Sequence, residues 1–253
     1  MTRSSEKHHW ENFWDESQAI DDVYDNGGRV LAALGRGFEP RGARVLEVGA
    51  GSGRDSLELV GRGAEVWVVD YTPSALRLIA RQPGGDRLVR ICGDAFGLPF
   101  GDGTFDAVFH QGLLEHFREP RPLLAENARV LKPGGILLVD VPQRWHYYTL
   151  LKHALIAADK WFAGWETEFS IGELRALVRS VGLRPEHEYG DWCVPNLFYR
   201  VGRKMLLRHG VRLPKQPTVP IVGPALQRWR DGLASTALPL YLGMNIGCVA
   251  RKE

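Results

Sequence analysis

Short apolar runs alternate with amphipathic stretches along most of this chain. Runs rich in Val, Ile, Leu and Phe are typical of buried strands, and seven are expected, at residues 44–48, 65–69, 88–92, 105–109, 136–141, 184–189 and 244–251. Between them, apolar residues recur with helical periodicity, which predicts helices at residues 19–35, 53–63, 73–81, 122–131 and 171–181. Strands separated by such helices form βαβ units, so the pattern predicts a mostly parallel sheet with helices on both faces.

The residues that flank these segments agree with the predicted helix ends. Thr72 followed by Pro73 is an N-cap with proline at the first helical position, and Ser170 is placed to cap the helix that follows it. The run Lys132-Pro133-Gly134-Gly135 is expected to end one helix and to separate it from the strand at 136–141.

Two stretches interrupt the alternation of strands and helices. Residues 143–169 are rich in Trp and Tyr, and residues 195–240 contain a basic segment and several prolines. Both follow strand ends, on the side of the sheet where ligands bind in open α/β folds. We expect a single domain over residues 1–253, with an N-terminal segment and helix at 1–40, a ligand-binding core at 41–142 and two insertions that cover the site.

Composition narrows the class of protein without identifying it. The 32 basic and 30 acidic residues give a net charge of +2, which offers no electrostatic reason to expect a nucleic-acid partner. The three cysteines are widely spaced and no cluster of ligand residues suggests a metal, so we expect reduced thiols in a cytoplasmic protein. The polar N-terminus and the lack of any run of about 18 apolar residues argue against a signal peptide and a spanning helix.

The strongest chemical signal is the sequence VLEVGAGSGRDS at residues 45–56. Its apolar part suits a buried strand, and Gly49, Gly51 and Gly53 let the following turn approach a ligand closely. The GxGxG spacing differs from the GxGxxG that marks dinucleotide sites. Glu47 precedes the turn, and an anion there repels phosphate but favours an ammonium or sulfonium cation.

Two further carboxylates follow neighbouring strands. Asp70 ends the second strand, about 20 residues beyond the glycines, where it can accept hydrogen bonds from the two hydroxyls of a ribose. Asp94 follows the third strand and is expected to reach the same crevice, where it can accept a hydrogen bond from the exocyclic amine of adenine. Together with Glu47, these positions predict a cationic, nucleoside-like ligand.

With these residues in place, the chain resembles the class I S-adenosylmethionine-dependent methyltransferases of small molecules, a group that includes the ubiquinone and menaquinone biosynthesis enzymes. The resemblance rests on four motifs in order over roughly residues 40–142, namely VLEVGAGSGRDS, VWVVDYTPSAL, GDAFGLPFGDGTFDAVF and LLEHFREPRPLLAENARVLKPGGILLVDVP. It implies a Rossmann-like sheet of seven strands, mostly parallel with an antiparallel last strand. It also implies S-adenosylmethionine as the cofactor and S-adenosylhomocysteine as its product.

The resemblance assigns the cofactor to Glu47, Gly49, Ala50, Gly51, Gly53, Asp70, Tyr71, Asp94, Ala95, His110 and Gln111. The glutamate and the glycines of the turn would face the methionyl part. Asp70 would bind the ribose hydroxyls, Tyr71 would lie against adenine, and Asp94 with Ala95 would hold the adenine edge. A purely structural role is the alternative for each of them, and it is strongest for Tyr71, Asp94 and Gln111.

The candidate catalytic residues follow the fourth strand. His110 and Gln111 would border the reacting methyl group. A base is needed only if the acceptor is a hydroxyl, a protonated amine or an acidic carbon. His116 is the first candidate, with Glu115 beside it, because histidine accepts a proton near neutral pH, although capping or packing is the stronger alternative for this residue. His146, at the start of the first insertion, is a second candidate base, and an ordinary lid residue is the alternative there.

The insertions bear on the acceptor. The aromatic stretch 143–169 would bury a large apolar or aromatic ligand, or would pack on the domain as a satellite of its core. A third interpretation is that its aromatic residues, with the basic stretch 200–215, dock on a membrane surface. Residues 8–14, with two histidines and two tryptophans, either fold over the cofactor or are unstructured.

We therefore predict S-adenosylmethionine-dependent methyl transfer to a small aromatic or lipophilic acceptor, with O-methylation favoured over C- and N-methylation. A nicotinamide-dependent oxidoreductase would need a GxGxxG turn suited to phosphate. A nucleic-acid methyltransferase would need a basic face or an (N/D)PP(Y/F) motif where this chain has HQGLLEH. A non-catalytic protein that binds S-adenosylmethionine without turnover is harder to dismiss, and the sequence leaves the acceptor atom and the oligomeric state open.

Overall fold

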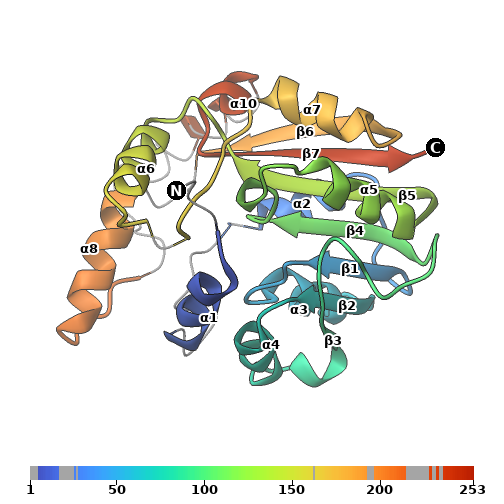
Figure 1. The fold of residues 1–253 in the computed structure, drawn as a ribbon, viewed down its shortest axis with the longest axis horizontal. Helices are drawn as coiled ribbons and strands as arrows, with labels where there is room; N and C mark the ends of the chain where they lie inside the picture. The colour runs from blue at the N-terminus through green and yellow to red at the C-terminus, as the bar shows by residue number, and fades with distance from the viewer. Residues whose placement is uncertain are drawn as a thin grey trace.

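The computed structural model describes residues 5–16, 26, 28–161, 163–192, 197–214, 228–229, 232–233 and 236–253. A seven-stranded sheet with the order β3-β2-β1-β4-β5-β7-β6 runs through the molecule (Figure 1). Its strands are β1 (Arg44–Val48), β2 (Glu65–Asp70), β3 (Val89–Cys92), β4 (Phe105–Gln111), β5 (Leu131–Pro142), β6 (Leu183–Asp191) and β7 (Asn245–Lys252). The pairings among β1 to β5 are parallel, and β7 runs antiparallel to β5 and β6. The predicted sheet, with its antiparallel last strand, is confirmed.

Helices cover both faces of this sheet. They are α1 (Lys7–Glu16), α2 (Arg29–Leu34), α3 (Arg54–Gly61), α4 (Pro73–Ala80), α5 (Arg121–Val130), α6 (Tyr147–Ala157), α7 (Ile171–Arg179), α8 (Leu197–Arg208) and α10 (Leu238–Leu242), with the short 3-10 helices η2 (Gly85–Arg87) and η3 (Leu114–His116). Pro73 occupies the first turn of α4, as predicted. Ser170 caps α7 through a capping box with Glu173, in which each side chain bonds the other residue's backbone N–H.

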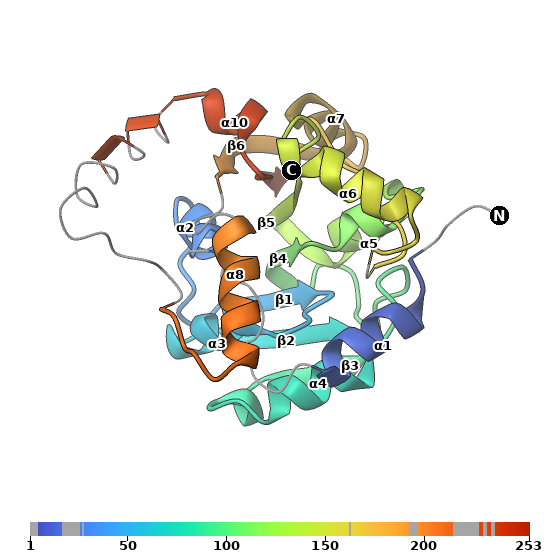
Figure 2. The same ribbon diagram turned by 90° about the vertical axis from the view of Figure 1, so that its left-hand side faces the viewer.

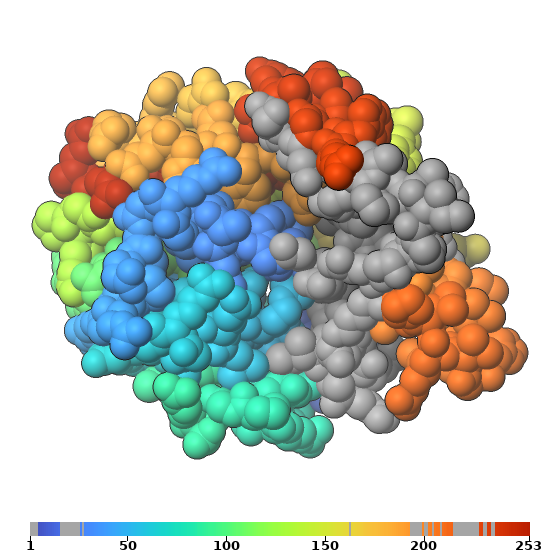
Figure 3. Space-filling model, turned by 180° about the vertical axis from the view of Figure 1, so that it is seen from behind, coloured from blue at the N-terminus to red at the C-terminus, as the bar shows by residue number. Residues whose placement is uncertain are grey.

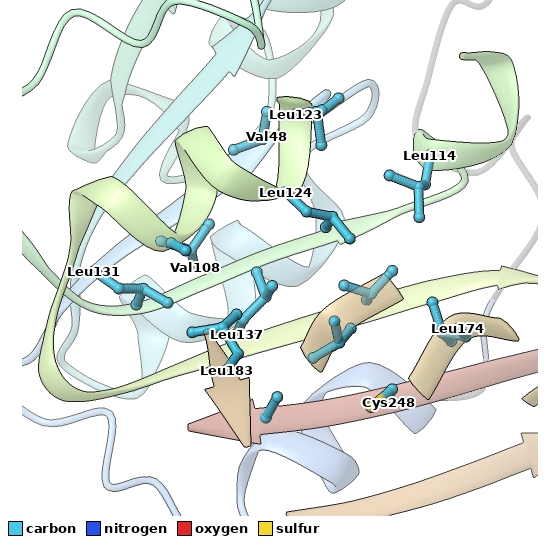
Figure 4. Packing of buried hydrophobic residues seen from close by; sticks show 14 of the residues in the cluster. Val48, Val108, Leu114, Leu123, Leu124, Leu131, Leu137, Leu174, Leu183 and Cys248 are labelled. Carbon is cyan, nitrogen blue, oxygen red and sulfur yellow. The ribbon is translucent and has the colours of Figure 1, made fainter. Parts of the chain in front are cut away.

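The apolar residues divide into two layers, one on each face of the sheet. On one face, α5 and α7 contribute Leu124 and Leu174, which belong to a buried cluster with Leu137 of β5 and Cys248 of β7 (Figure 4). On the other face, residues of α2, α3 and α4 pack against β1, β2 and β4 in a second cluster. Seen from behind, the segments around α2 and α3 occupy part of the surface, and α8 projects at one edge (Figure 3).

The structure departs from the predicted elements in three places. Residues 7–16, expected to be a polar start, form α1. Of the helix predicted at 19–35, the structure shows α2, while residues 17–25 and 27 lie outside the described residues. The prediction that Lys132-Pro133-Gly134-Gly135 separates the helix from the strand was wrong. Leu131 is fully buried and pairs with Phe105, so β5 begins directly after α5 and includes this run.

The C-terminal ends of the parallel strands lie at one edge of the sheet. Because β7 is antiparallel to β5, the arrow of β7 points away from this edge, and α1, α6 and α8 lie on the side toward which β5 runs (Figure 1). These three helices face the viewer in Figure 2. The first insertion thus supplies α6, and the second supplies α8 and α10, in agreement with their predicted position near the strand ends.

Candidate active site

The turn after β1 requires glycine at three positions. Gly49, Gly51 and Gly53 have φ values of +65°, +52° and +64°, in the left-handed region that favours glycine. The backbone N–H groups of Gly49 and Ala50 both donate to the carbonyl oxygen of Val69, at 2.7 and 3.2 Å. Neighbouring side chains come within 2.5 to 2.8 Å of the position that a Cβ would take at each of the three glycines. The turn is therefore fixed to the end of β2, and neighbouring side chains pack closely against its three glycines.

Glu47 lies beneath this turn with its side chain buried. Its Oε2 accepts a hydrogen bond of 2.5 Å from Oγ of Ser56, and it forms no ion pair with any described residue. Burial, and secondly the nearby Asp55 carboxyl, raise the pKa of Glu47 from 4.5 to about 8. A cation bound beside it would favour the ionised carboxylate, so Glu47 suits a sulfonium or ammonium ligand better than a phosphate.

Asp70 is held rigidly at the end of β2. One oxygen accepts from the backbone N–H of Gly51 at 2.9 Å, and the other accepts from the backbone N–H and the hydroxyl of Thr72 at 2.9 and 2.6 Å. Burial raises the pKa of Asp70, and these hydrogen bonds oppose that effect. Three of the roughly four lone-pair sites of the carboxylate are thus occupied, so the oriented side chain can accept one further hydrogen bond, as from a ribose hydroxyl, without rearranging.

The residues expected around adenine lie close to the surface. Tyr71 is 38% exposed, and the Nζ atom of Lys7 lies 5.7 Å from its ring centroid. Asp94 is exposed and accepts from the backbone N–H of Phe96 at 3.0 Å, while Ala95 is half-buried. Sequence reasoning missed Phe96, an exposed aromatic side chain beside the predicted adenine edge.

Helix α1 lies across the glycine turn. The Trp14 ring fills the space next to Gly51, with Cζ2 2.5 Å from the position of a Cβ there. Trp10, one turn earlier on the same face of α1, meets the His116 ring edge-on at 4.6 Å between centroids. Asp15 pairs with Arg77 of α4 at 3.2 Å. Of the two alternatives for the N-terminal residues, the structure shows the folded one, and a bound cofactor would have to share this space with Trp14.

His116 is placed as a neutral histidine with a free basic nitrogen. Its Nε2 lies 3.1 Å from the carbonyl oxygen of Gly112, and because a carbonyl only accepts, Nε2 carries the proton. Nδ1 has no hydrogen-bond partner in the described part of the chain and lies 3.9 Å from Oε1 of Glu166. Burial lowers the pKa of His116, and Glu166 opposes this shift. Burial therefore favours the neutral ring, and its unprotonated Nδ1 is buried on the side of Glu166.

A buried charge cluster from the first insertion lies behind His116. Lys152 is 2% exposed, and its Nζ atom lies 3.0 Å from Glu166 and 2.6 Å from Glu168. Burial alone would lower the pKa of Lys152, but the two glutamates raise it above its ordinary value. Burial, and secondly the Glu166 carboxylate, raise the pKa of Glu115 well above its usual range. This cluster was not predicted from the sequence. The two-residue spacing of Glu166 and Glu168 was a weak signal, because side chains two residues apart lie on the same side of an extended backbone.

The remaining candidates have different surroundings. His146 caps α6, where its Nδ1 accepts from the backbone N–H of Tyr148 at 3.3 Å. His110 is fully buried, and neither ring nitrogen has a hydrogen-bond partner among the described residues. Burial lowers the pKa of His110 to about 4. Gln111 accepts from the side-chain amide of Asn26 at 2.9 Å. The structure therefore supplies a capping role for His146 and a neutral ring for His110.

A second buried network, also missed from the sequence, joins α2 to the sheet. Arg29 donates to both oxygens of the fully buried Asp140, at 2.9 and 2.8 Å. Tyr189 and Asn245 donate to the same carboxylate at 2.8 and 3.1 Å. The residues of this network come from α2, β5, β6 and β7, so it holds the ends of these three strands together. Gln111 pairs with Asp140 in the sheet register and therefore lies beside the network.

Among the described residues, neither a metal-ligand cluster nor the depression at the other end of the strands adds to this site. No group of three or more His, Cys, Asp or Glu side chains able to hold a metal ion occurs among the described residues. A shallow depression lined by Phe38, Lys132 and Arg251 lies at the opposite end of the strands, where β4 and β5 begin, far from the glycine turn along the sheet.

Comparisons with known proteins agree with this geometry. Residues 46–139 match the family model described as a methyltransferase domain. Over 99 residues, the chain is 40% identical to a demethylmenaquinone methyltransferase of Clavibacter sepedonicus, covering 39% of this chain and 40% of that protein. Over 189 residues, it is 27% identical to the O-methyltransferase cnsE of Penicillium expansum, covering 68% of this chain and 63% of that protein. The chain matches less than two thirds of the length of either relative.

The fold is shared with a solved methyltransferase structure. The 1,6-didemethyltoxoflavin-N1-methyltransferase of Burkholderia thailandensis, solved with S-adenosylhomocysteine and 1,6-didemethyltoxoflavin, superposes with a TM-score of 0.52 at 21% identity, covering 97% of this chain and 83% of that chain. Residues 46–139 match the methyltransferase domain family, and the fold is that of the class I S-adenosylmethionine-dependent methyltransferases. The cofactor of this class is S-adenosylmethionine.

Proposed function

We propose that this protein transfers a methyl group from S-adenosylmethionine to a small aromatic or lipophilic acceptor. The observation that carries the proposal is the convergence of two buried carboxyls on one glycine turn. Glu47 suits a cationic centre, and Asp70 is oriented for a ribose. The three left-handed glycines, which carry no Cβ, allow other groups to approach the backbone of the turn closely. This set of groups fits S-adenosylmethionine and does not fit a pyrophosphate.

S-Adenosylmethionine supplies an activated methyl group, so the protein has to position the acceptor, exclude water and receive a proton where the acceptor carries one. His116 offers Nδ1 as the proton acceptor, and its Nε2–H···O hydrogen bond to Gly112 fixes the ring orientation. Lys152 holds Glu166 and Glu168 in place behind it. Trp10 packs against the His116 ring and shields it from solvent.

The aromatic character of the first insertion supports an apolar acceptor. Trp145 and Tyr147 are 66% and 54% exposed beside α6, on the side of the sheet where the site lies (Figure 2). Exposed aromatic side chains of this kind can cover an apolar ligand once it binds. O-methylation is the preferred reaction within this proposal, because a hydroxyl acceptor gives the neutral His116 a proton to accept.

Calorimetry is the first test of the cofactor. The protein should bind S-adenosylmethionine and S-adenosylhomocysteine, and NADH should give no heat of binding. Binding of NADH without binding of S-adenosylmethionine would show that the proposal is wrong. Release of S-adenosylhomocysteine in a screen of phenolic and lipophilic hydroxyl compounds should then identify the acceptor; cofactor binding without turnover on any of them would favour the non-catalytic alternative.

The role of His116 has its own test. His116→Ala should lower kcat by roughly a hundredfold or more, the usual contribution of a positioned base, while leaving the affinity for S-adenosylhomocysteine unchanged. Arg81→Ala, at an exposed position after α4, is the control and should have wild-type activity. Full activity of the His116 variant would assign this residue a structural role.

A further inference from the structure

Charge is distributed very unevenly along this chain. Residues 192–230 contain eight of the 32 basic residues and none of the 30 acidic ones. The remaining 24 basic and 30 acidic residues leave the rest of the chain with a net charge of −6. The overall value of +2 therefore hides a concentrated positive segment on an acidic protein, and such a segment attracts an anionic partner.

Helix α8 lies within this positive segment and exposes apolar side chains. Its sequence, LFYRVGRKMLLR, has four basic residues and no acidic one. Met205 is 61% exposed, and Leu206 and Leu207 are 40% and 41% exposed. Val211 and Arg212, just beyond the helix, are also exposed. An exposed helix that combines cations with apolar residues is typical of a protein that lies on a membrane interface.

A second set of exposed apolar residues lies on and beside α6. These are Trp145, Tyr147, Leu150 and Leu151, with exposed fractions of 66%, 54%, 77% and 47%. Figures 1 and 2 place α6 and α8 on the same side of the molecule, toward which the parallel strands run. We call the residues 145, 147, 150, 151 and 205–207 the exposed apolar surface. It borders the candidate active site, so a ligand within a bilayer would reach the site from this side.

We propose that the exposed apolar surface and the positive segment that contains α8 dock this protein on an anionic lipid bilayer. Lys and Arg are attracted to anionic headgroups, while Trp, Tyr, Leu and Met insert at the boundary with the acyl chains. None of the described helices is long and apolar enough to cross a membrane, so the contact is interfacial. The proposal does not depend on methyl transfer and is tested without it.

Two other partners fit the surface less well. A nucleic acid would explain the cations, but phosphate and sugar groups do not bury Met205, Leu206 or the side chains of α6. A second copy of the chain would bury the apolar residues. It would, however, bring two copies of α8 into contact, each with four basic residues and no acidic one, and like charges repel. An anionic bilayer satisfies both the charge and the apolar side chains.

Sedimentation with lipid vesicles tests the proposal. The full chain is mixed with phosphatidylcholine vesicles and with vesicles containing phosphatidylglycerol, at low and at high salt. Binding is expected to the anionic vesicles, with weaker binding at high salt because the charges are screened. Met205→Glu should reduce binding roughly tenfold by opposing insertion, and Arg212→Glu roughly fivefold or more by reversing one surface cation.

Matched controls separate the surface from general effects of charge. Val89→Glu changes another exposed apolar residue, 47% exposed on the edge strand β3. Arg81→Glu reverses an exposed cation after α4. Both controls should bind vesicles within about twofold of wild type. Circular dichroism and melting temperature confirm that each variant is folded.

The outcomes decide between the partners. Loss of vesicle binding in Met205→Glu and Arg212→Glu, with both controls unchanged, supports the proposal. Absence of binding to anionic vesicles, or equal binding by all variants, would overturn it. Binding of duplex DNA or RNA without vesicle binding would assign the cations to a nucleic acid. A dimer in light scattering that Met205→Glu disperses, again without vesicle binding, would assign the surface to a second copy.

Discussion

Replacing Glu47 by glutamine is expected to stabilise the ligand-free protein. Burial and the neighbouring Asp55 raise the pKa of Glu47 from 4.5 to about 8. When folding raises the pKa of an acid, the folded state loses stability as the pH rises above the pKa of that acid in the unfolded chain. In this pH range the acid ionises in the unfolded chain but stays protonated in the folded one. At about 1.4 kcal/mol per pKa unit, the cost at pH 7 is about 3 kcal/mol. Glutamine has the same shape and does not ionise, so this cost disappears.

The sign and the pH window of the effect are defined by the two pKa values. Relative to Glu47→Gln, the wild type should lose about 2 to 3 kcal/mol of unfolding free energy between roughly pH 5.5 and 7.5, a range that lies between 4.5 and about 8. Above the folded pKa the difference levels off. The glutamine oxygen can still accept the hydrogen bond from Ser56, so the comparison isolates the charge.

Urea denaturation followed by tryptophan fluorescence at the two pH values is the assay. Other titrating groups are common to both proteins and cancel in the difference between them. A saturating amount of S-adenosylmethionine should stabilise the wild type more than Glu47→Gln, because its positive charge interacts with an ionised Glu47. A stability difference that is the same at both pH values would refute the argument from burial. Equal stabilisation of both proteins by S-adenosylmethionine would refute the assignment of Glu47 to the cofactor.

Two further predictions concern the ribose site and the buried lysine. Asp70→Ala removes an oriented carboxylate and should weaken S-adenosylhomocysteine binding by roughly tenfold to a hundredfold in calorimetry, and an unchanged affinity would contradict the ribose role. Lys152→Met leaves Glu166 and Glu168 buried without their cation and should cost about 3 to 5 kcal/mol of unfolding free energy in urea. In the control Lys132→Met, both side chains of the ion pair between Lys132 and Asp106 are more than a third exposed. This substitution should lower the unfolding free energy by less than about 1 kcal/mol. A similar loss in both lysine variants would show that burial does not decide the effect.

The shape of the glycine turn and the position of Asp70 could be predicted from the sequence because their determinants are local, whereas their assignment to the cofactor stays a prediction. A glycine with positive φ, such as Gly51, and a carboxylate at the end of a strand, such as Asp70, are fixed by their immediate neighbours in the chain. Parallel strands then bring these ends to one edge of the sheet. The adenine and catalytic assignments stay predictions, because the structure shows where the residues lie and not what they bind.

The parts that sequence reasoning missed depend on tertiary contacts. Arg29 and Asp140 are 111 residues apart, and no local pattern pairs them. Helix α1 is polar on average, and only the structure shows its tryptophans packed against the glycine turn and His116. The neutral state of His116 follows from its hydrogen bond to Gly112, whose geometry exists only in the folded chain.

Two of the buried acidic sites among the described residues differ in where their counter-charge comes from. In the first insertion, Lys152 supplies a cation to Glu166 and Glu168, so that site is complete within the chain. At the glycine turn, Glu47 has a hydrogen bond from Ser56 but no ion pair with a described residue. A cationic ligand would do for Glu47 what Lys152 does for the insertion. Since S-adenosylhomocysteine lacks the sulfonium charge, the product should stabilise the wild type less than S-adenosylmethionine does at equal saturation, and this preference should shrink in Glu47→Gln. The same carboxyl would thereby favour binding of the charged cofactor and release of the uncharged thioether.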